Sequence, residues 1–93
     1  MKTKTTKQLE RHFKGIANHY RLDILLLIAA QPKINLDAIV RELKANVKTI
    51  AEHTRRLHIA GLINKKYQGH SVEHTLSPYG ETVYKFIKSF SNS

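Results

Sequence analysis

The segment 24–30 constrains the fold of this 93-residue chain more than any other, because its seven consecutive residues are all apolar. It forms most of a helix predicted over 21–30, in which Asp23 is the only acidic residue. A helix without a polar face has to be enclosed by other elements. Gln31 and Pro32 end it, since proline disfavours the helical conformation of the residue before it. We therefore expect a single domain over 7–93 built around this helix, as the chain length also favours.

An amphipathic helix is predicted upstream of this central segment. From Lys7 to Tyr20, apolar side chains recur at steps of three and four residues. The preceding residues 1–6 alternate Lys and Thr and have no apolar residue after Met1, so we expect them to form a flexible basic arm.

Two further helices are predicted downstream, separated by a tight turn. Asn35 is a candidate N-cap for a short helix with an apolar stripe that ends near Leu43, after a very short strand at Ile34. Asn46 is a candidate N-cap for a longer helix, which stops at Gly61 because glycine commonly ends helices. This helix–turn–helix pair is the first functional signal in the chain.

The helical pattern changes to a strand pattern after Gly61. The short segments 62–67 and 71–76 flank residues 68–70, and a glycine between two such segments predicts a β-hairpin. A last helix begins with Ser77 as N-cap and Pro78 at its first position. The chain is therefore predicted to be mainly α with a small hairpin, in the order α-α-α-α-β-β-α of a winged helix-turn-helix.

The net charge of +9 points to a polyanionic partner, for which nucleic acid is the usual choice. The charge is uneven: residues 1–21 carry six Lys and Arg against one Glu, and residues 44–76 carry six against two. Residues 22–43 have a net charge of −1. The basic stretches thus flank a nearly neutral core, and the second contains the predicted helix-turn-helix and hairpin.

The second helix of the pair is the candidate recognition helix, which enters the major groove of DNA in this architecture. Projection at 100° per residue turns Val47, Ile50, Thr54 and Leu57 toward the core. Lys48 and Thr49 suit base edges or phosphates, and the later arginines suit phosphates. The candidate DNA-binding residues are Lys48, Thr49, Glu52, His53, Arg55, Arg56, Lys65, Lys66 and His70.

Two of these positions admit a second interpretation. Glu52 could accept a hydrogen bond from a cytosine amino group, but it would repel phosphates, and we favour an intrahelical ion pair with Lys48, Arg55 or Arg56. Lys65 and Lys66 are adjacent on a strand and point to opposite faces, so only one is expected to reach a given DNA strand. Both could instead be solvated lysines that discourage edge-to-edge pairing.

Three segments together resemble the ArsR-type winged-helix repressors, within a wider MarR- and PadR-like group. Residues 16–25 are similar to the Arg-Leu-x-Ile-Leu segment that opens their core, and residues 48–63 resemble their recognition helix with the Ala-Gly-Leu-Ile that follows. Residues 76–80 resemble the Leu-Ser-Pro-x-Gly before their last helix. The resemblance implies a homodimeric transcriptional regulator, with Thr49 and His53 at recognition-helix positions and His70 at the wing tip.

The same resemblance implies that the first and last helices form the dimer interface. Apolar residues on these two helices would supply it: Leu9, Phe13, Ile16, Tyr79, Val83, Phe86, Ile87 and Phe90. The sequence departs from the family pattern at Glu52, at Lys44, which replaces the usual glycine of the turn, and in having no cysteine for thiolate metal sensing.

Three other functions are alternatives to DNA binding. A winged helix used for protein–protein contact would have the same apolar last helix but would need no cationic recognition helix. A metal-responsive regulator would need converging ligands, and the six histidines are not spaced as a zinc site, so no metal or other cofactor is predicted. An enzyme is disfavoured because there is no cysteine nucleophile, phosphate-binding glycine loop or carboxylate pair at catalytic spacing.

No apolar run is long enough to span a membrane, and we expect a cytoplasmic protein with double-stranded DNA as partner.

Overall fold

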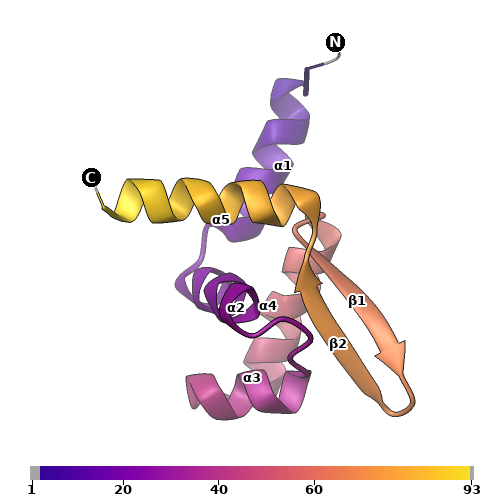
Figure 1. Ribbon diagram of the computed structural model, residues 1–93. Coiled ribbons are helices and arrows are strands. Elements are labelled where there is room, and N and C mark those ends of the chain that lie inside the picture. Colours follow the sequence, from indigo (N-terminus) through magenta and orange to yellow (C-terminus); the bar gives the residue numbers. More distant parts are fainter. Residues whose placement is uncertain (1–2, 93) are drawn as a thin grey trace.

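The computed structural model describes residues 3–92, which form five α-helices and one β-hairpin (Figure 1). The elements follow in the order α1 (Thr6–Ile16), α2 (His19–Ala30), α3 (Leu36–Leu43), α4 (Val47–Ile59), β1 (Ile63–Gln68), β2 (Ser71–Leu76) and α5 (Pro78–Ser91). In Figure 1, α1 and α5 lie at the opposite end of the molecule from α3 and the hairpin tip. The predicted winged helix-turn-helix order is confirmed.

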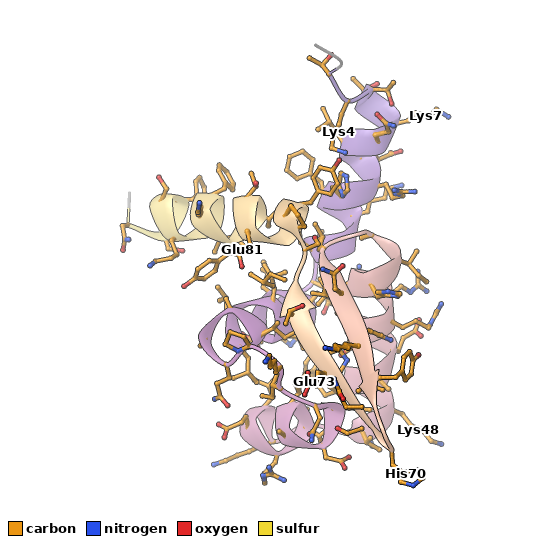
Figure 2. The ribbon with its side chains drawn as sticks, turned by 45° about the vertical axis from the view of Figure 1, so that its right-hand side comes forward. Lys4, Lys7, Lys48, His70, Glu73 and Glu81 are labelled. Atoms are coloured by element: carbon orange, nitrogen blue, oxygen red, sulfur yellow. The ribbon has the colours of Figure 1, made fainter. Side chains whose placement is uncertain are left out.

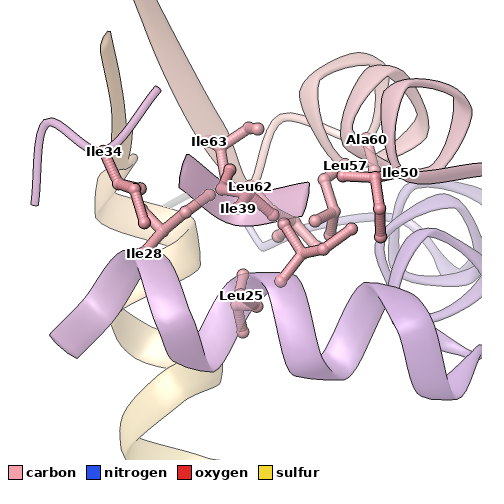
Figure 3. Packing of buried hydrophobic residues seen from close by; sticks show 10 residues of the cluster. Leu25, Ile28, Ile34, Ile39, Ile50, Leu57, Ala60, Leu62 and Ile63 are labelled. Carbon is pink, nitrogen blue, oxygen red and sulfur yellow. The ribbon is translucent and has the colours of Figure 1, made fainter. Parts of the chain in front are cut away.

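The core is built around α2, as its all-round apolar sequence predicts. Ile24, Leu25 and Ile28 are fully buried, and buried residues of α3, α4 and β1 pack with them (Figure 3). The cluster of buried apolar residues comprises Ile24, Leu25, Ile28, Ile34, Ile39, Ile50, Leu57, Ala60, Leu62 and Ile63. Burying a leucine or isoleucine side chain contributes about 1.5–3 kcal/mol, so this cluster is a major source of hydrophobic stabilisation.

The boundary between α1 and α2 differs from the prediction of a helix that continues to Tyr20. α1 ends at Ile16, and α2 begins at His19 because the Asn18 side chain caps it. The Asn18 carboxamide oxygen accepts hydrogen bonds from the backbone N–H groups of Tyr20 (2.9 Å) and Arg21 (3.3 Å). An asparagine cap satisfies donors that the first turn leaves free, and here it breaks an apolar pattern that reads as continuous.

Part of the expected basic arm over 1–6 contacts the helices. Thr5 caps α1 in a capping box with Gln8, and Lys4 places its ammonium 3.9 Å from the centre of the Tyr79 ring. The predicted arm therefore overlaps the first turn of α1, while Lys2 lies outside the described residues.

The turn between α3 and α4 is formed where the sequence predicts it. Asn35 caps α3 and Asn46 caps α4, the latter by accepting from the N–H groups of Lys48 and Thr49. Lys44, which stands where the resemblance implies glycine, adopts the left-handed conformation with φ 52° and ψ 45°. A side chain in this conformation costs about 1–2 kcal/mol. The turn thus keeps the backbone geometry of a glycine without the glycine.

The hairpin pairs β1 with β2 in antiparallel register from Ile63↔Leu76 to Gln68↔Ser71. Gly69 begins its two-residue turn with φ 61°, as hairpin turns require. Ile34 forms the predicted short strand contact as a single bridge to His74. The His74 N–H donates to the Ile34 carbonyl over 3.0 Å, so the hairpin is attached to the loop before α3.

Two glycines permit close approach of elements. A Cβ at Gly15 would collide with the Ala60 side chain, and a Cβ at Gly80 would collide with the Leu62 carbonyl oxygen. The absence of a side chain at Gly15 lets α1 cross the end of α4. The absence of a side chain at Gly80 lets the first turn of α5 pack against the backbone just after α4. Within residues 3–92, no helix is long and apolar enough to cross a membrane.

Candidate nucleic-acid interface

The inner face of α4 is fixed by Ile50, Thr54 and Leu57, which are buried as predicted. Val47 was expected on this face, but it is 49% exposed, and that prediction is wrong. It is the first residue of α4, and helical side chains lean toward the N-terminus, so its side chain extends beyond the turn that packs on the core. The exposed face of α4 is therefore wider at its start than projection suggests.

The exposed face of α4 carries three cations and one carboxylate. Lys48 is exposed in the first turn and projects toward the same end of the molecule as His70 at the hairpin tip (Figure 2). Thr49 is half-buried, and Arg55 and Arg56 are exposed along the same helix. Together they present donors along a helix at the surface, which is the arrangement that a DNA groove requires.

Glu52 binds both arginines rather than pointing free. Its carboxylate accepts two hydrogen bonds from Arg55, from Nε and Nη2, each over 2.9 Å, and a third from Nε of Arg56 over 2.9 Å. These hydrogen bonds and the positive charges lower the pKa of Glu52 to about 2. The favoured intrahelical ion pair is thus present, and Glu52 holds two cations in place while offsetting one charge.

His53 is engaged by α2 instead of lying free beside the helix. Nε of Arg21 donates to Nδ1 of His53 over 3.2 Å, and the Tyr20 ring stacks on the imidazole at 5.4 Å. Because Nδ1 accepts, the imidazole is neutral with its proton on Nε2. Burial and the neighbouring Arg21 charge lower the pKa of His53. Among residues 3–92, the N–H at Nε2 of His53 has no hydrogen-bond partner, so it can donate to another molecule.

The hairpin separates its two lysines as predicted. Lys65 pairs with His74 on the strand face that turns toward α4, and it is half-buried. Lys66 pairs with Glu73 on the opposite face and is exposed. Tyr67, which is not among the DNA-binding residues predicted from the sequence, is 75% exposed near the hairpin tip. Alternation places Tyr67 on the same strand face as the buried Ile63, so the sequence pattern does not predict its exposure, and nothing in the spacing marks it as a DNA-binding candidate.

Two further histidines, His12 and His74, have structural partners. His74 is 2% exposed and its Nδ1 lies 2.9 Å from the Ile34 carbonyl oxygen, while Nδ1 of His12 lies 2.8 Å from that of Ala60. Burial lowers the pKa of His74. In the part of the chain that the structure describes, no three His, Asp or Glu side chains are grouped as metal ligands.

The first and last helices form an apolar surface at the other end of the molecule. Phe13 is 59% exposed and Phe86 is 58% exposed, and both line a groove of about 330 Å³ between α1 and α5. Leu9, Tyr79 and Phe90 are also exposed, whereas Ile16, Val83 and Ile87 are half-buried against the core. Exposed apolar clusters of this kind mark interaction surfaces.

These features define the class of the fold as a winged helix, and solved structures agree. HlyU from Vibrio cholerae N16961 superposes with a TM-score of 0.85 and 19% identity, over 99% of this chain and all of that chain. A second similar structure is the homodimeric winged helix-turn-helix DNA-binding domain of Mb0332 from Mycobacterium bovis, described as a possible ArsR-family transcriptional regulator. Its TM-score is 0.84 and its sequence identity is 20%, over 99% of this chain and 91% of that chain.

The transcriptional regulator HlyU from Vibrio vulnificus CMCP6 has a TM-score of 0.77 and 22% identity, over 91% of this chain and 88% of that chain. No protein-family model matches the sequence, and no curated protein does. At these identities the likeness establishes the fold, and the function has to be argued from the residues.

Proposed function

We propose that the protein is a homodimeric, sequence-specific, double-stranded-DNA-binding transcriptional regulator, and that it represses by occupying its site. The observation that carries the proposal is the cationic exposed face of α4, which is capped at its start by Asn46 and flanked by the wing. Solved structures with this fold include a homodimeric DNA-binding domain and proteins named as transcriptional regulators, which supports the assignment and favours a non-enzymatic role in the cytoplasm.

In the proposed complex, Lys48 and Thr49 face base edges at the start of α4, and Arg56 and Lys66 contact phosphates. Arg55 and His53 belong to the same surface, and they have intramolecular partners, as Arg56 does through its Nε. The wing adds Lys65 or its exposed neighbours and His70 at the tip. In a dimer formed by α1 and α5, two recognition helices would meet successive major grooves about 34 Å apart.

The proposal is tested by the salt dependence of binding to duplex DNA. Neutralising 6–10 phosphates should reduce affinity by about 10³–10⁵ between 50 and 200 mM salt, because each contact releases counterions. A flat response would contradict DNA binding. Selection of bound sequences from a random duplex pool then tests specificity, and a pseudo-palindromic consensus with half-sites one helical turn apart is expected.

A protein-docking module is the second candidate, and the exposed aromatic residues of α5 are the observation that favours it. The two functions are separated by Lys48→Ala and Thr49→Ala, which should relax sequence choice in the DNA selection and leave any protein contact through α5 intact. If the wild-type protein enriches no DNA sequence in this selection, the docking module is favoured.

A further inference from the structure

A second cationic feature lies between the C-terminal ends of α1 and α4, away from the hairpin. It is a pocket of about 150 Å³ whose lining includes four cations and no carboxylate. The cations come from three helices, Arg11 and Lys14 from α1, Arg21 from α2 and Arg56 from α4. A single water needs only about 10–15 Å³ of such space, so the pocket has room for a small oxyanion.

The pocket follows from the close crossing of α1 and α4. Gly15 has no Cβ, and this absence lets the end of α1 lie against Ala60, which follows the last residue of α4. Both residues line the pocket. Cations in the last turn of each helix, Lys14 and Arg56, suit the negative end of the helix dipole.

Arg21 is held in place before any ligand binds. Its Nη1 donates to the carbonyl oxygen of Lys14 over 2.7 Å and to that of Gly15 over 3.4 Å, and its Nε donates to His53. Nη2 makes no hydrogen bond to any residue within 3–92. A guanidinium fixed by its neighbours loses little side-chain entropy when it binds an anion.

The other three cations also keep donors for a ligand. Arg56 is bound to Glu52 through Nε alone, and Lys14 is paired with Glu10 at 3.4 Å with both side chains exposed. The Arg11 side chain makes no hydrogen bond or ion pair with any residue that the structure describes. The two glutamates offset two of the four charges, so the region retains an excess of two positive charges. Guanidinium groups with free terminal nitrogens match the geometry of a phosphate.

We propose that this pocket binds a phosphate group, and that the group belongs to the DNA backbone. The choice of DNA rests on the proposed function and on Arg56, which lines the pocket and also lies on the exposed face of α4. A phosphate here would be contacted from α1 as well as α4. It would fix the position of the duplex on the protein without reading sequence, as phosphate contacts do.

The first test compares Arg11→Gln with Lys7→Gln, an equal loss of charge one turn earlier on α1 at a residue that does not line the pocket. Binding to duplex DNA is measured over a range of salt concentrations. For Arg11→Gln, the slope of log K against log salt should fall by about 0.9 for each protomer bound, with a similar loss of affinity for all sequences. Lys7→Gln should keep the wild-type slope, and Arg11→Lys should restore most of the affinity.

The second test uses inorganic phosphate without DNA. At constant ionic strength, phosphate should shift the NMR amide signals of Gly15 and Ala60 in a saturable way in the wild type and not in Arg11→Gln. A saturable shift together with an unchanged DNA salt slope would reassign the pocket to a free phosphorylated ligand and overturn the DNA source. If neither readout responds to Arg11→Gln, the pocket proposal is wrong even when the protein binds DNA. If the protein binds no DNA at all, the proposed function is wrong, and the phosphate titration alone decides whether the pocket binds phosphate.

Discussion

At the residue scale, Glu52 limits how many free cations the exposed face of α4 presents. Three hydrogen bonds hold Arg55 and Arg56 against its carboxylate, so neither guanidinium can turn fully toward a phosphate without giving up this partner. With its pKa lowered to about 2, the carboxylate stays charged at any pH used for binding. In the proposed DNA complex, Glu52 would reduce the charge-driven binding that is common to all sequences and leave a larger share of the affinity to base contacts.

Replacing Glu52 by Gln should raise affinity for all duplexes and make the salt dependence steeper, since the two arginines become free to contact phosphates. Specificity, measured as the ratio of specific to random-sequence affinity, should fall. Glu42→Gln on α3 is the matched control, because Glu42 is exposed and makes no ion pair with a described residue. An equal rise in the control would show that net charge alone accounts for the effect.

The histidines predict how stability depends on pH. Burial is the main cause that lowers the pKa of both His53 and His74 from the usual 6.5. As the pH falls below 6.5, the unfolded chain takes up these protons before the folded protein does, so the free energy of unfolding decreases. Glu52 does not contribute in this range because it remains ionised.

Urea unfolding should therefore show a lower midpoint at about pH 5.5 than at about pH 7.5. His53→Gln should reduce this difference, since glutamine does not titrate. His70→Gln is the control, because it removes an exposed imidazole at the hairpin tip by the same substitution. A pH dependence that both variants share with the wild type would contradict the assignment to His53.

At the element scale, the packing of α5 against the rest of the protein depends on Gly80. Glycine to alanine in a helix normally stabilises by about 1 kcal/mol, but here the new Cβ would collide with a backbone oxygen, that of Leu62, which cannot rotate away. Gly80→Ala should therefore be net destabilising by about 1–3 kcal/mol, as overpacking usually is. Chemical denaturation measures this, with Lys85→Ala on the same helix as the exposed control. A more stable Gly80→Ala would mean that α5 shifts without cost.

The elements that local signals specify could be predicted from the sequence. Asn35, Asn46 and Ser77 begin α3, α4 and α5 as expected, because a cap acts within three residues of itself. The break at Asn18 was missed because the apolar spacing of α1 continues into α2. Helical periodicity cannot reveal a two-residue interruption that preserves the same face.

The candidate site could be predicted only where helical projection sufficed. Lys48, Arg55 and Arg56 are exposed as the 100° step implies, whereas Val47 was misplaced because projection ignores where a helix begins. The contact of Arg21 with His53 joins residues 32 positions apart, and no local pattern encodes it. The same holds for the pocket between α1 and α4, whose four cations meet only after the helices cross.

At the scale of the whole molecule, two surfaces with different chemistry lie apart. Lys48 at the start of α4 and the hairpin tip lie toward one end of the molecule (Figure 2), and α1 and α5, whose side chains line the apolar groove, lie toward the other (Figure 1). Self-association through the apolar surface would leave both recognition helices free. This separation supports a dimer that binds two half-sites, and it predicts that the two activities can be separated by substitution.

Phe86→Glu should convert the proposed dimer into a folded monomer. The side chain is 58% exposed, so its replacement costs little in the monomer but places a carboxylate in an apolar interface. Light scattering at micromolar concentration should show half the wild-type mass, with the helical circular dichroism unchanged. Tyr67→Glu is the matched control, since it changes an aromatic residue on the hairpin that is also exposed, and this variant should remain dimeric. Because a monomer contacts one half-site at a time, affinity for a palindromic duplex should fall far more than affinity for a single half-site. A wild-type monomer, or a Phe86→Glu variant of unchanged mass, would place the dimer interface elsewhere.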